Sequence, residues 1–127
     1  LKEEFARTGF FNEYGGSDAG YASITLSALS VYAERASDEE TREWVASRAG
    51  DLGRKLKDDG TYDYSGQSRA TRFFYPHALA GPENPQIERI ANGVAGGKIL
   101  MPSGMDDRYM VPYAADYLRA ACRLSKS

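Results

Sequence analysis

The chain has 127 residues, of which 42% are hydrophobic, 27% charged and 12% aromatic, so we expect one folded domain with its own core. Its net charge of −2 lacks the basic excess of a nucleic-acid-binding protein, and no apolar run approaches the about 20 residues of a membrane span. One cysteine excludes an internal disulfide, and one histidine excludes two-histidine metal sites. We therefore expect no nucleic-acid partner, no membrane association, no metal and no cofactor. The chain opens on Leu1 without a secretory signal, which favours a cytoplasmic location and leaves a secreted parent protein open.

The predicted core is poor in aliphatic side chains and rich in tyrosine. Leu, Ile, Val and Phe together number 22, whereas the chain has 17 Ala and nine Tyr. Alanine lets helices approach closely, and tyrosine adds buried area with a hydroxyl that needs a partner. Two compatible interpretations follow: tyrosines at the polar margin of an Ala-rich helical core, or several tyrosines lining a wet groove.

Two amphipathic helices are predicted in the first half of the chain. The first covers 19–36, and its apolar face shows a spacing of three and four residues; this face contains Ala22, Leu26, Leu29 and Ala33. Ser37 and Glu40 then form a capping-box pattern, which predicts Ser37 as the N-cap of a second helix that runs to about Lys57. Asp58-Asp59-Gly60 ends that helix. The short connection predicts an antiparallel hairpin.

The second half is less regular. Residues 61–69 are polar and turn-rich, so we expect at most a short β-ribbon there. Residues 72–77 predict the start of a short helix with Pro76 in its first turn, and 85–95 predict another helix.

The final predicted helix covers 107–124. Its expected apolar stripe contains Tyr109, Tyr113, Tyr117, Ala120 and Leu124. Pro112 fits this helix only near its first turn. Cys122 is interpreted as a small buried side chain.

A loose internal repeat links the loops. Residues 9–16 and 60–66 both read as glycine, any residue, an aromatic, Asn or Asp, and then Tyr and Gly, with their first glycines 51 positions apart. A weaker version occurs at 104–109. A period of about 50 residues matches one helical hairpin with its loop.

The segments NEYGGSDAGY (12–21) and SRATRFFYPH (68–77) resemble parts of bacterial α/α-toroid proteins similar to heparinase II/III-type polysaccharide lyases and six-hairpin glycosidases. This resemblance implies an all-α fold of antiparallel helical hairpins in series. A complete toroid of that kind has about six hairpins, and this chain has about two and a half, whose exposed edges need neighbours. We therefore expect residues 1–127 to form a single helical domain that is a fragment of a larger toroid. Two alternatives stay open, namely closure by forming a homo-oligomer and an ordinary small helical domain.

The first candidate site is centred on the single histidine. In a polysaccharide lyase, Arg or His would neutralise a uronate carboxylate and Tyr would transfer the proton. Arg72, Tyr75 and His77 provide these groups within six residues, and Arg69 precedes them. Packing of His77 beside a short helix is the alternative interpretation.

Acidic residues near predicted helix starts suggest a second chemistry. Glycoside hydrolysis uses two carboxylates, about 5–5.5 Å apart for retention and about 6.5–9.5 Å apart for inversion. Glu13 and Asp18 flank a glycine pair, and Asp106 and Asp107 precede the last helix. Helix capping is the alternative role of Asp18 and of Asp106 or Asp107.

The predicted site therefore has two groups of residues. The catalytic candidates are His77, Tyr75, Arg72, Glu13 and Asp18. The ligand-binding candidates are Tyr14, Tyr21, Tyr64, Arg69, Asp106, Asp107 and Arg108.

We interpret the chain as a carbohydrate-active protein or a portion of one, a glycan hydrolase or lyase with a tyrosine-lined site and a glycan ligand. One alternative is a non-catalytic helical scaffold or oligomerisation module. A further alternative is a terpenoid-cyclase-like toroid, which shares the hairpins and for which only Asp106-Asp107 provides an acidic motif.

Overall fold

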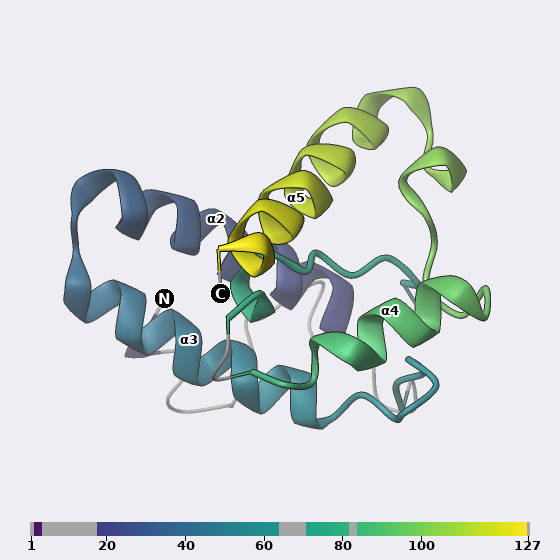
Figure 1. Cartoon of the computed structure of the whole chain (residues 1–127), viewed down its shortest axis with the longest axis horizontal. Helices are drawn as coiled ribbons and strands as arrows, with labels where there is room; N and C mark the ends of the chain where they lie inside the picture. Colours follow the sequence, from purple (N-terminus) through teal and green to yellow (C-terminus); the bar gives the residue numbers. More distant parts are fainter. Residues whose placement is uncertain (1, 4–17, 64–70, 82–83, 127) are drawn as a thin grey trace.

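The computed structural model describes residues 2–3, 18–63, 71–81 and 84–126. The described residues contain no strand (Figure 1), which confirms the predicted all-α class. The elements in chain order are α2 (Ala19–Ala36), α3 (Glu39–Arg54), the 3₁₀ helix η1 (His77–Leu79), α4 (Ile87–Ala95), the 3₁₀ helix η2 (Pro102–Gly104) and α5 (Asp107–Ser125).

The helices α2 and α3 form the predicted antiparallel hairpin (Figure 1). Their connection differs from the prediction, because Asp38 and not Ser37 is the N-cap of α3. Ser37 has a left-handed backbone with φ of 52° and closes α2. The following carboxylate therefore caps α3, accepting bonds from the Thr41 backbone N–H (3.0 Å) and the Thr41 hydroxyl (2.8 Å).

The hydrophobic core lies between the hairpin and the chain that crosses it. The buried members of its main cluster come from α2, α3 and α4, from η1 and from the connecting segments. They include Ala22, Leu26, Val45, Ala49, Leu52, Leu56, Tyr62, Phe74, Leu79, Ile90 and Ile99. Tyrosine and alanine thus fill core positions, as the composition predicts.

Two helix boundaries in the middle of the chain differ from the prediction. The helix α3 ends at Arg54 rather than near Lys57, because the Lys57 N–H bonds to the Thr61 carbonyl (2.8 Å) in a turn that contains Gly60 at φ 83°. Residues 71–76 form no helix, and Pro76, at φ −86° and ψ −14°, directly precedes η1.

The absence of a helix over 71–76 has a physical cause. The backbone N–H groups of Phe74 and Tyr75 bond to the Tyr113 hydroxyl (3.1 Å) and to Ser23 Oγ (2.9 Å). Both donors are therefore satisfied by side chains of other elements, and a helix would have to break these bonds.

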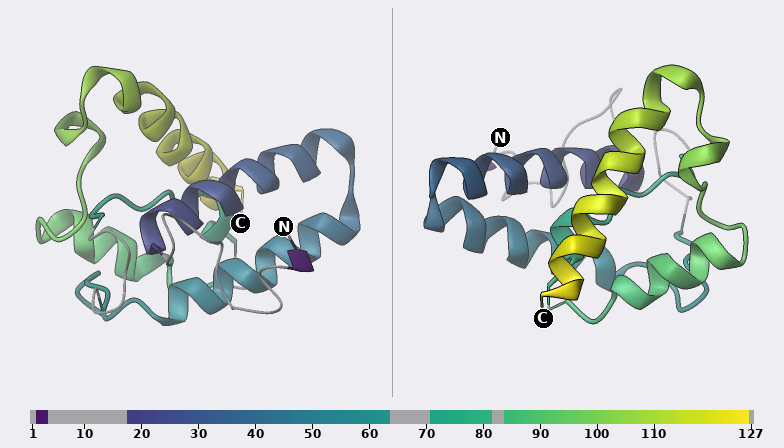
Figure 2. Two further views of the ribbon diagram at one scale, coloured as in Figure 1. Left: turned by 180° about the vertical axis from the view of Figure 1, so that it is seen from behind. Right: turned by 45° about the horizontal axis from the view of Figure 1, so that its top comes forward.

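The last helix, α5, runs obliquely to the hairpin rather than alongside it (Figure 1 and Figure 2) and packs against η1 and η2. It continues through Pro112, in its second turn. Its buried residues are Tyr113, Asp116 and Ala120, so the predicted stripe is wrong in part, since Tyr109 is 51% exposed and Leu124 39%.

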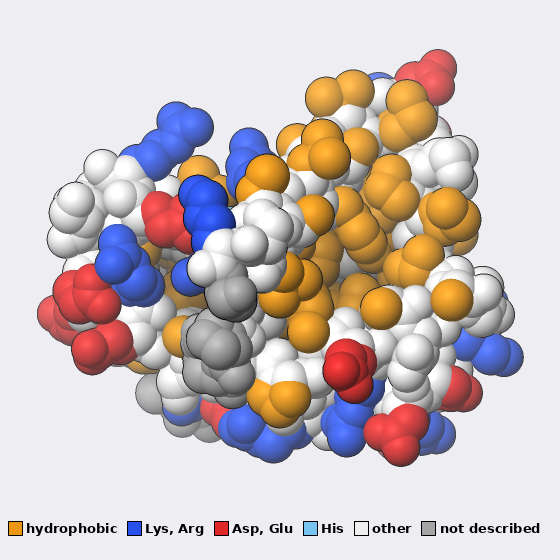
Figure 3. Space-filling model, in the orientation of Figure 1, with side chains coloured by type: hydrophobic (Ala, Val, Ile, Leu, Met, Phe, Trp, Pro, Cys, Tyr) orange, Lys and Arg blue, Asp and Glu red, His pale blue; other side chains and the backbone are white. Residues whose placement is uncertain are grey.

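Cys122 is exposed, so its interpretation as a buried side chain is wrong. It lies two positions after the buried Ala120, and a step of two residues leads to the opposite side of a helix. Apolar side chains gather over α5 and over the hollow between α5 and α4 (Figure 3). No described helix combines the length and the apolar character that crossing a membrane requires.

Candidate functional site

His77 lies at the centre of the molecule, at the start of η1. Its residue surface is 3% exposed, and its backbone N–H donates to Asp116 Oδ2 (2.9 Å). Its ring Nε2 lies 3.3 Å from Glu34 Oε1 of α2, but neither ring nitrogen makes a hydrogen bond to a described residue. A buried imidazole without hydrogen bonds is unusual, because burying a polar group without a partner costs free energy.

Burial lowers the pKa of the His77 imidazole, and the nearby Glu34 and Asp116 carboxylates oppose this shift. The direction follows from the cost of placing a charge where water is excluded. The imidazole is therefore mostly neutral at neutral pH, and a neutral imidazole nitrogen can accept a proton.

The His77 ring forms part of the wall of a surface pocket of about 420 Å³. The pocket is lined by residues of α2, η1 and the C-terminal half of α5 and by the residue after α5. They are Glu34, His77, Leu118, Arg119, Cys122, Arg123 and Lys126. Three cationic side chains and one carboxylate thus line the pocket together with His77, a composition that suits an anionic ligand.

Arg123 connects the two sides of this pocket. Its Nη1 lies 3.5 Å from Glu34 Oε1, 3.4 Å from the His77 carbonyl oxygen and 3.4 Å from Ser30 Oγ. Arg119 and Lys126 form no ion pair with any residue in the described part of the chain. These two cations are consequently available to a ligand.

A buried carboxylate holds η1 against α5. Asp116 is 2% exposed, and its Oδ2 accepts both the His77 N–H (2.9 Å) and the Ser27 hydroxyl of α2 (3.3 Å). Burial raises the pKa of this carboxyl, although both hydrogen bonds lower it. Asp116 therefore positions the backbone of His77, while the pocket itself is lined by other residues.

The tyrosines next to His77 form an aromatic cluster. Tyr75 is 8% exposed, and its ring meets that of Tyr113 edge to face at 5.0 Å. The Tyr113 hydroxyl donates to the Leu100 carbonyl (2.8 Å) and lies 3.2 Å from the Tyr117 hydroxyl. Tyr21 joins the cluster through an edge-to-face contact with Phe73 at 5.6 Å. These ring contacts hold residues 71–76 against α2 and α5.

The structure does not bring Arg72 into the His77 pocket. Arg72 is exposed and, with Tyr62 and Thr71, lines a separate small cavity. The cations beside His77 are instead Arg119 and Arg123.

The predicted acidic residues that the structure describes serve as helix caps or lie beside one. Asp18 caps α2: its Oδ1 accepts the Tyr21 N–H (3.0 Å) and the Thr71 hydroxyl, and the residue is 2% exposed. Asp106 caps α5 by accepting the Arg108 N–H (3.0 Å), and Asp107 and Arg108 are exposed.

The other four site candidates lie outside the described residues. They are Glu13, Tyr14, Tyr64 and Arg69.

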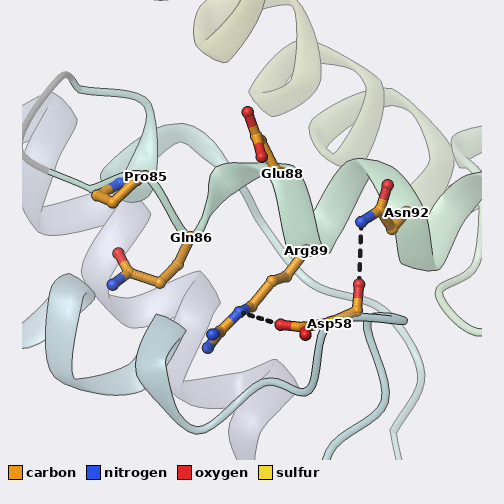
Figure 4. Close-up of a pocket in the computed structure, with 6 residues that line it drawn as sticks. All are labelled: Asp58, Pro85, Gln86, Glu88, Arg89 and Asn92. Atoms are coloured by element: carbon orange, nitrogen blue, oxygen red, sulfur yellow. Dashed lines mark hydrogen bonds and ion pairs between the residues drawn. The ribbon is translucent and has the colours of Figure 1, made fainter.

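A second pocket, of about 290 Å³, is lined by residues of α4, by the two residues before it and by Asp58 of the turn after α3. Figure 4 shows Arg89 and Asn92 of α4 directed toward Asp58. Arg89 donates to the Leu56 carbonyl (2.8 Å) and pairs with Asp58 (3.2 Å), and Asn92 donates to the Asp58 carbonyl (3.0 Å). These contacts fasten α4 to the turn, so we assign the pocket a structural role.

Several residues of the His77 pocket were missed in the sequence. Arg119 and Arg123 are four positions apart, with Lys126 three further, so they share one side of a helix and could have been found by their spacing. Glu34 and Asp116 gave no such signal, because only the tertiary fold brings them to His77.

The described residues contain no group of three His, Cys, Asp or Glu side chains that could hold a metal ion. Comparisons with known protein families, with curated proteins and with solved structures give no match to this chain.

Proposed function

We propose that the chain is a carbohydrate-active protein, or a portion of one, that binds an acidic glycan in the His77 pocket. The observation that carries this proposal is a buried imidazole that makes no hydrogen bond to a described residue, in the wall of a pocket of about 420 Å³ that three cations also line. A carboxylate on a sugar ring would pair with Arg119 and Arg123, because guanidinium groups bind carboxylates in a bidentate geometry. The all-α fold with its α2–α3 hairpin agrees with the proposal but does not distinguish among glycan chemistries.

Elimination is the reaction that this set of side chains would support best. Cations paired with the uronate carboxylate stabilise the charge that develops when the neighbouring carbon loses its proton. The neutral imidazole of His77 would accept that proton. The carbon–oxygen bond to the leaving sugar then breaks as a carbon–carbon double bond forms. The leaving oxygen takes up a proton, which restores the balance with the one that His77 accepted, so no further reactant is consumed.

Hydrolysis fits the pocket less well. It needs two carboxyl groups flanking the glycosidic bond, and among the residues that line the pocket Glu34 is the one carboxylate. Glu34 also lies beside both His77 and Arg123, which suits a positioning residue for the imidazole.

A panel of uronate-containing polysaccharides tests the proposal. Elimination creates a conjugated double bond, so product is measured by its ultraviolet absorbance, and binding is measured separately by calorimetry. We expect His77→Ala to lower the rate about 10²–10⁴-fold, the usual contribution of a general base, and Arg123→Ala to weaken binding. Arg42→Ala changes an arginine of α3 outside the pocket and should leave both readouts unchanged. The proposal is wrong if no polysaccharide in the panel binds or reacts, or if His77→Ala keeps full activity.

One observation favours a non-catalytic scaffold or oligomerisation module as the second candidate. Val111 and Leu118 of α5 are each 68% exposed, and exposed apolar surface of this kind marks an interaction site. The terpenoid-cyclase alternative has no such support, because Asp106 serves as the cap of α5.

A further inference from the structure

The outward side of α5 presents apolar side chains to solvent. Val111 and Leu118 are 68% exposed, and Met110 is 37% exposed. Figure 3 shows orange side chains spread over this helix. Exposure of several large apolar groups on one helix costs free energy unless another surface covers them.

These side chains follow a coiled-coil spacing. Val111, Ala114, Leu118 and Ala121 are three, four and three positions apart, which gives the 3.5-residue repeat of a helix that pairs with another helix. None of the four is buried. We call these four residues the α5 seam.

We propose that the α5 seam packs antiparallel against the α5 seam of a second copy of this chain. The two-fold axis passes the exposed side of α5 at the level of residue 116 along the helix. In this register Val111 faces Ala121 of the second copy, and Leu118 faces Ala114 of the second copy. Each large side chain thus meets a small one, and the symmetry repeats both pairs. Such alternation lets the two helices approach closely and fill the space between them.

The charges at the ends of α5 favour the antiparallel arrangement. Asp106 and Asp107 stand at the N-terminal end and Lys126 at the C-terminal end, and all three are exposed. In the proposed register Asp106 reaches the level of Lys126 of the second copy. A parallel pair would instead place the two acidic ends together, which is repulsive.

The expected dimer is weak. The helix α5 has 19 residues and is about 28 Å long, so one helix pair covers less than the about 800 Å² per partner of a standard stable interface. We therefore expect association at micromolar or higher concentration.

Light scattering across a concentration series tests the association. The mass should rise from 14.0 kDa toward twice that value. Leu118→Glu should keep the chain monomeric, and it loses little folding energy because Leu118 is 68% exposed. Tyr32→Glu is the matched control, since Tyr32 is a 56% exposed apolar residue of α2, and it should still dimerise. A wild-type chain that stays at 14.0 kDa up to about 1 mM overturns the proposal, as does a Leu118→Glu chain that still dimerises.

Disulfide cross-linking tests the orientation. In a Cys122→Ser background, Val111→Cys combined with Ala121→Cys should give an oxidised dimer, because each new thiol faces its counterpart on the second copy. Within one helix the two positions are about 15 Å apart, too far for a disulfide. Val111→Cys alone should not cross-link in the antiparallel pair, and a cross-link from this single variant would overturn the orientation. Mass and cross-linking are independent of any glycan, so a failure here leaves the proposed function standing.

Discussion

Asp116 provides the most direct test of how η1 is held in place. Replacement by alanine removes the acceptor of the His77 backbone N–H at 2.9 Å and of the Ser27 hydroxyl at 3.3 Å. A buried donor left without a partner costs about 1–3 kcal/mol. The Ser27 hydroxyl can rotate, so most of the loss arises at His77. Together with lost packing, we expect Asp116→Ala to lower the free energy of unfolding by about 2–4 kcal/mol, a large part of the about 5–15 kcal/mol of a typical domain.

Asp116→Asn should cost much less than the alanine variant. A single carboxylate oxygen, Oδ2, accepts both hydrogen bonds, and the amide oxygen of asparagine can take its place. The pKa of Asp116 is raised because burial outweighs these bonds, which means that the charge itself does not stabilise the fold. We therefore expect Asp116→Asn to remain within about 1 kcal/mol of wild type.

The two variants also predict a pH dependence. The carboxyl pKa of Asp116 is higher in the folded chain than its usual value, so the folded state binds more protons between the usual and the raised pKa. Stability contributed by this group is present at low pH and is lost as pH rises through that interval. Wild type should therefore lose stability relative to Asp116→Asn as the pH rises above the usual carboxyl pKa of about 4.

Urea denaturation of wild type, Asp116→Ala and Asp116→Asn, each at about pH 4 and about pH 7, measures these differences. If asparagine destabilises the chain as much as alanine does, the negative charge is required and burial does not dominate. If the gap between wild type and Asp116→Asn moves in the opposite direction with pH, the sign of the pKa shift is wrong.

Three further substitutions test local contacts by thermal or chemical denaturation. Gly60→Ala should lower the free energy of unfolding by about 1–3 kcal/mol, because Gly60 has φ of 83° and a Cβ there would collide with the backbone of Gly93 in α4. An unchanged free energy of unfolding would contradict this close approach. Tyr113→Phe should cost about 1–3 kcal/mol, since it removes the hydroxyl that accepts the buried Phe74 N–H, and an unchanged midpoint would show that this donor finds another acceptor. Asp38→Ala should lower the free energy of unfolding by about 1 kcal/mol, and Ser37→Ala should not remove a cap, because Asp38 is the N-cap of α3. A larger loss from Ser37→Ala than from Asp38→Ala would instead support Ser37 as the cap.

Local pattern predicted the helices well and their joints poorly. The bounds of α2 and the start of α5 agree with the prediction, because each helix begins directly after an aspartate cap, Asp18 or Asp106. The capping box failed because Ser37 adopts a left-handed backbone, which the letter pattern does not specify. The helix predicted over 72–77 failed for a different reason, since the backbone donors of Phe74 and Tyr75 are satisfied by side chains far away in the sequence.

The candidate site was only half predictable. His77 could be identified as the single histidine, but its surroundings depend on contacts between residues 39 to 89 positions apart in the chain. Arg72 is near His77 in the sequence, yet the fold places it at another cavity. Arg123 is remote in the sequence and lies against the His77 carbonyl. Proximity in sequence was therefore the wrong guide to the cations of this pocket.

The arrangement of α2 explains why the pocket forms where it does. Apolar residues of α2, such as Leu26, pack into the core. Three serines of α2 form hydrogen bonds instead: Ser23 with the segment 71–76, and Ser27 and Ser30 with α5. Serines bury at low cost only when their hydroxyls are paired, so Ser27 and Ser30 add directional bonds to α5 beside the ring contacts of Tyr113. The last of these serines is Ser30, and one turn further Glu34 meets His77 at the pocket. Ser27 and Ser30 thus bond to the same helix whose Arg123 lines the pocket, so these two serines contribute to the position of α5 beside the imidazole.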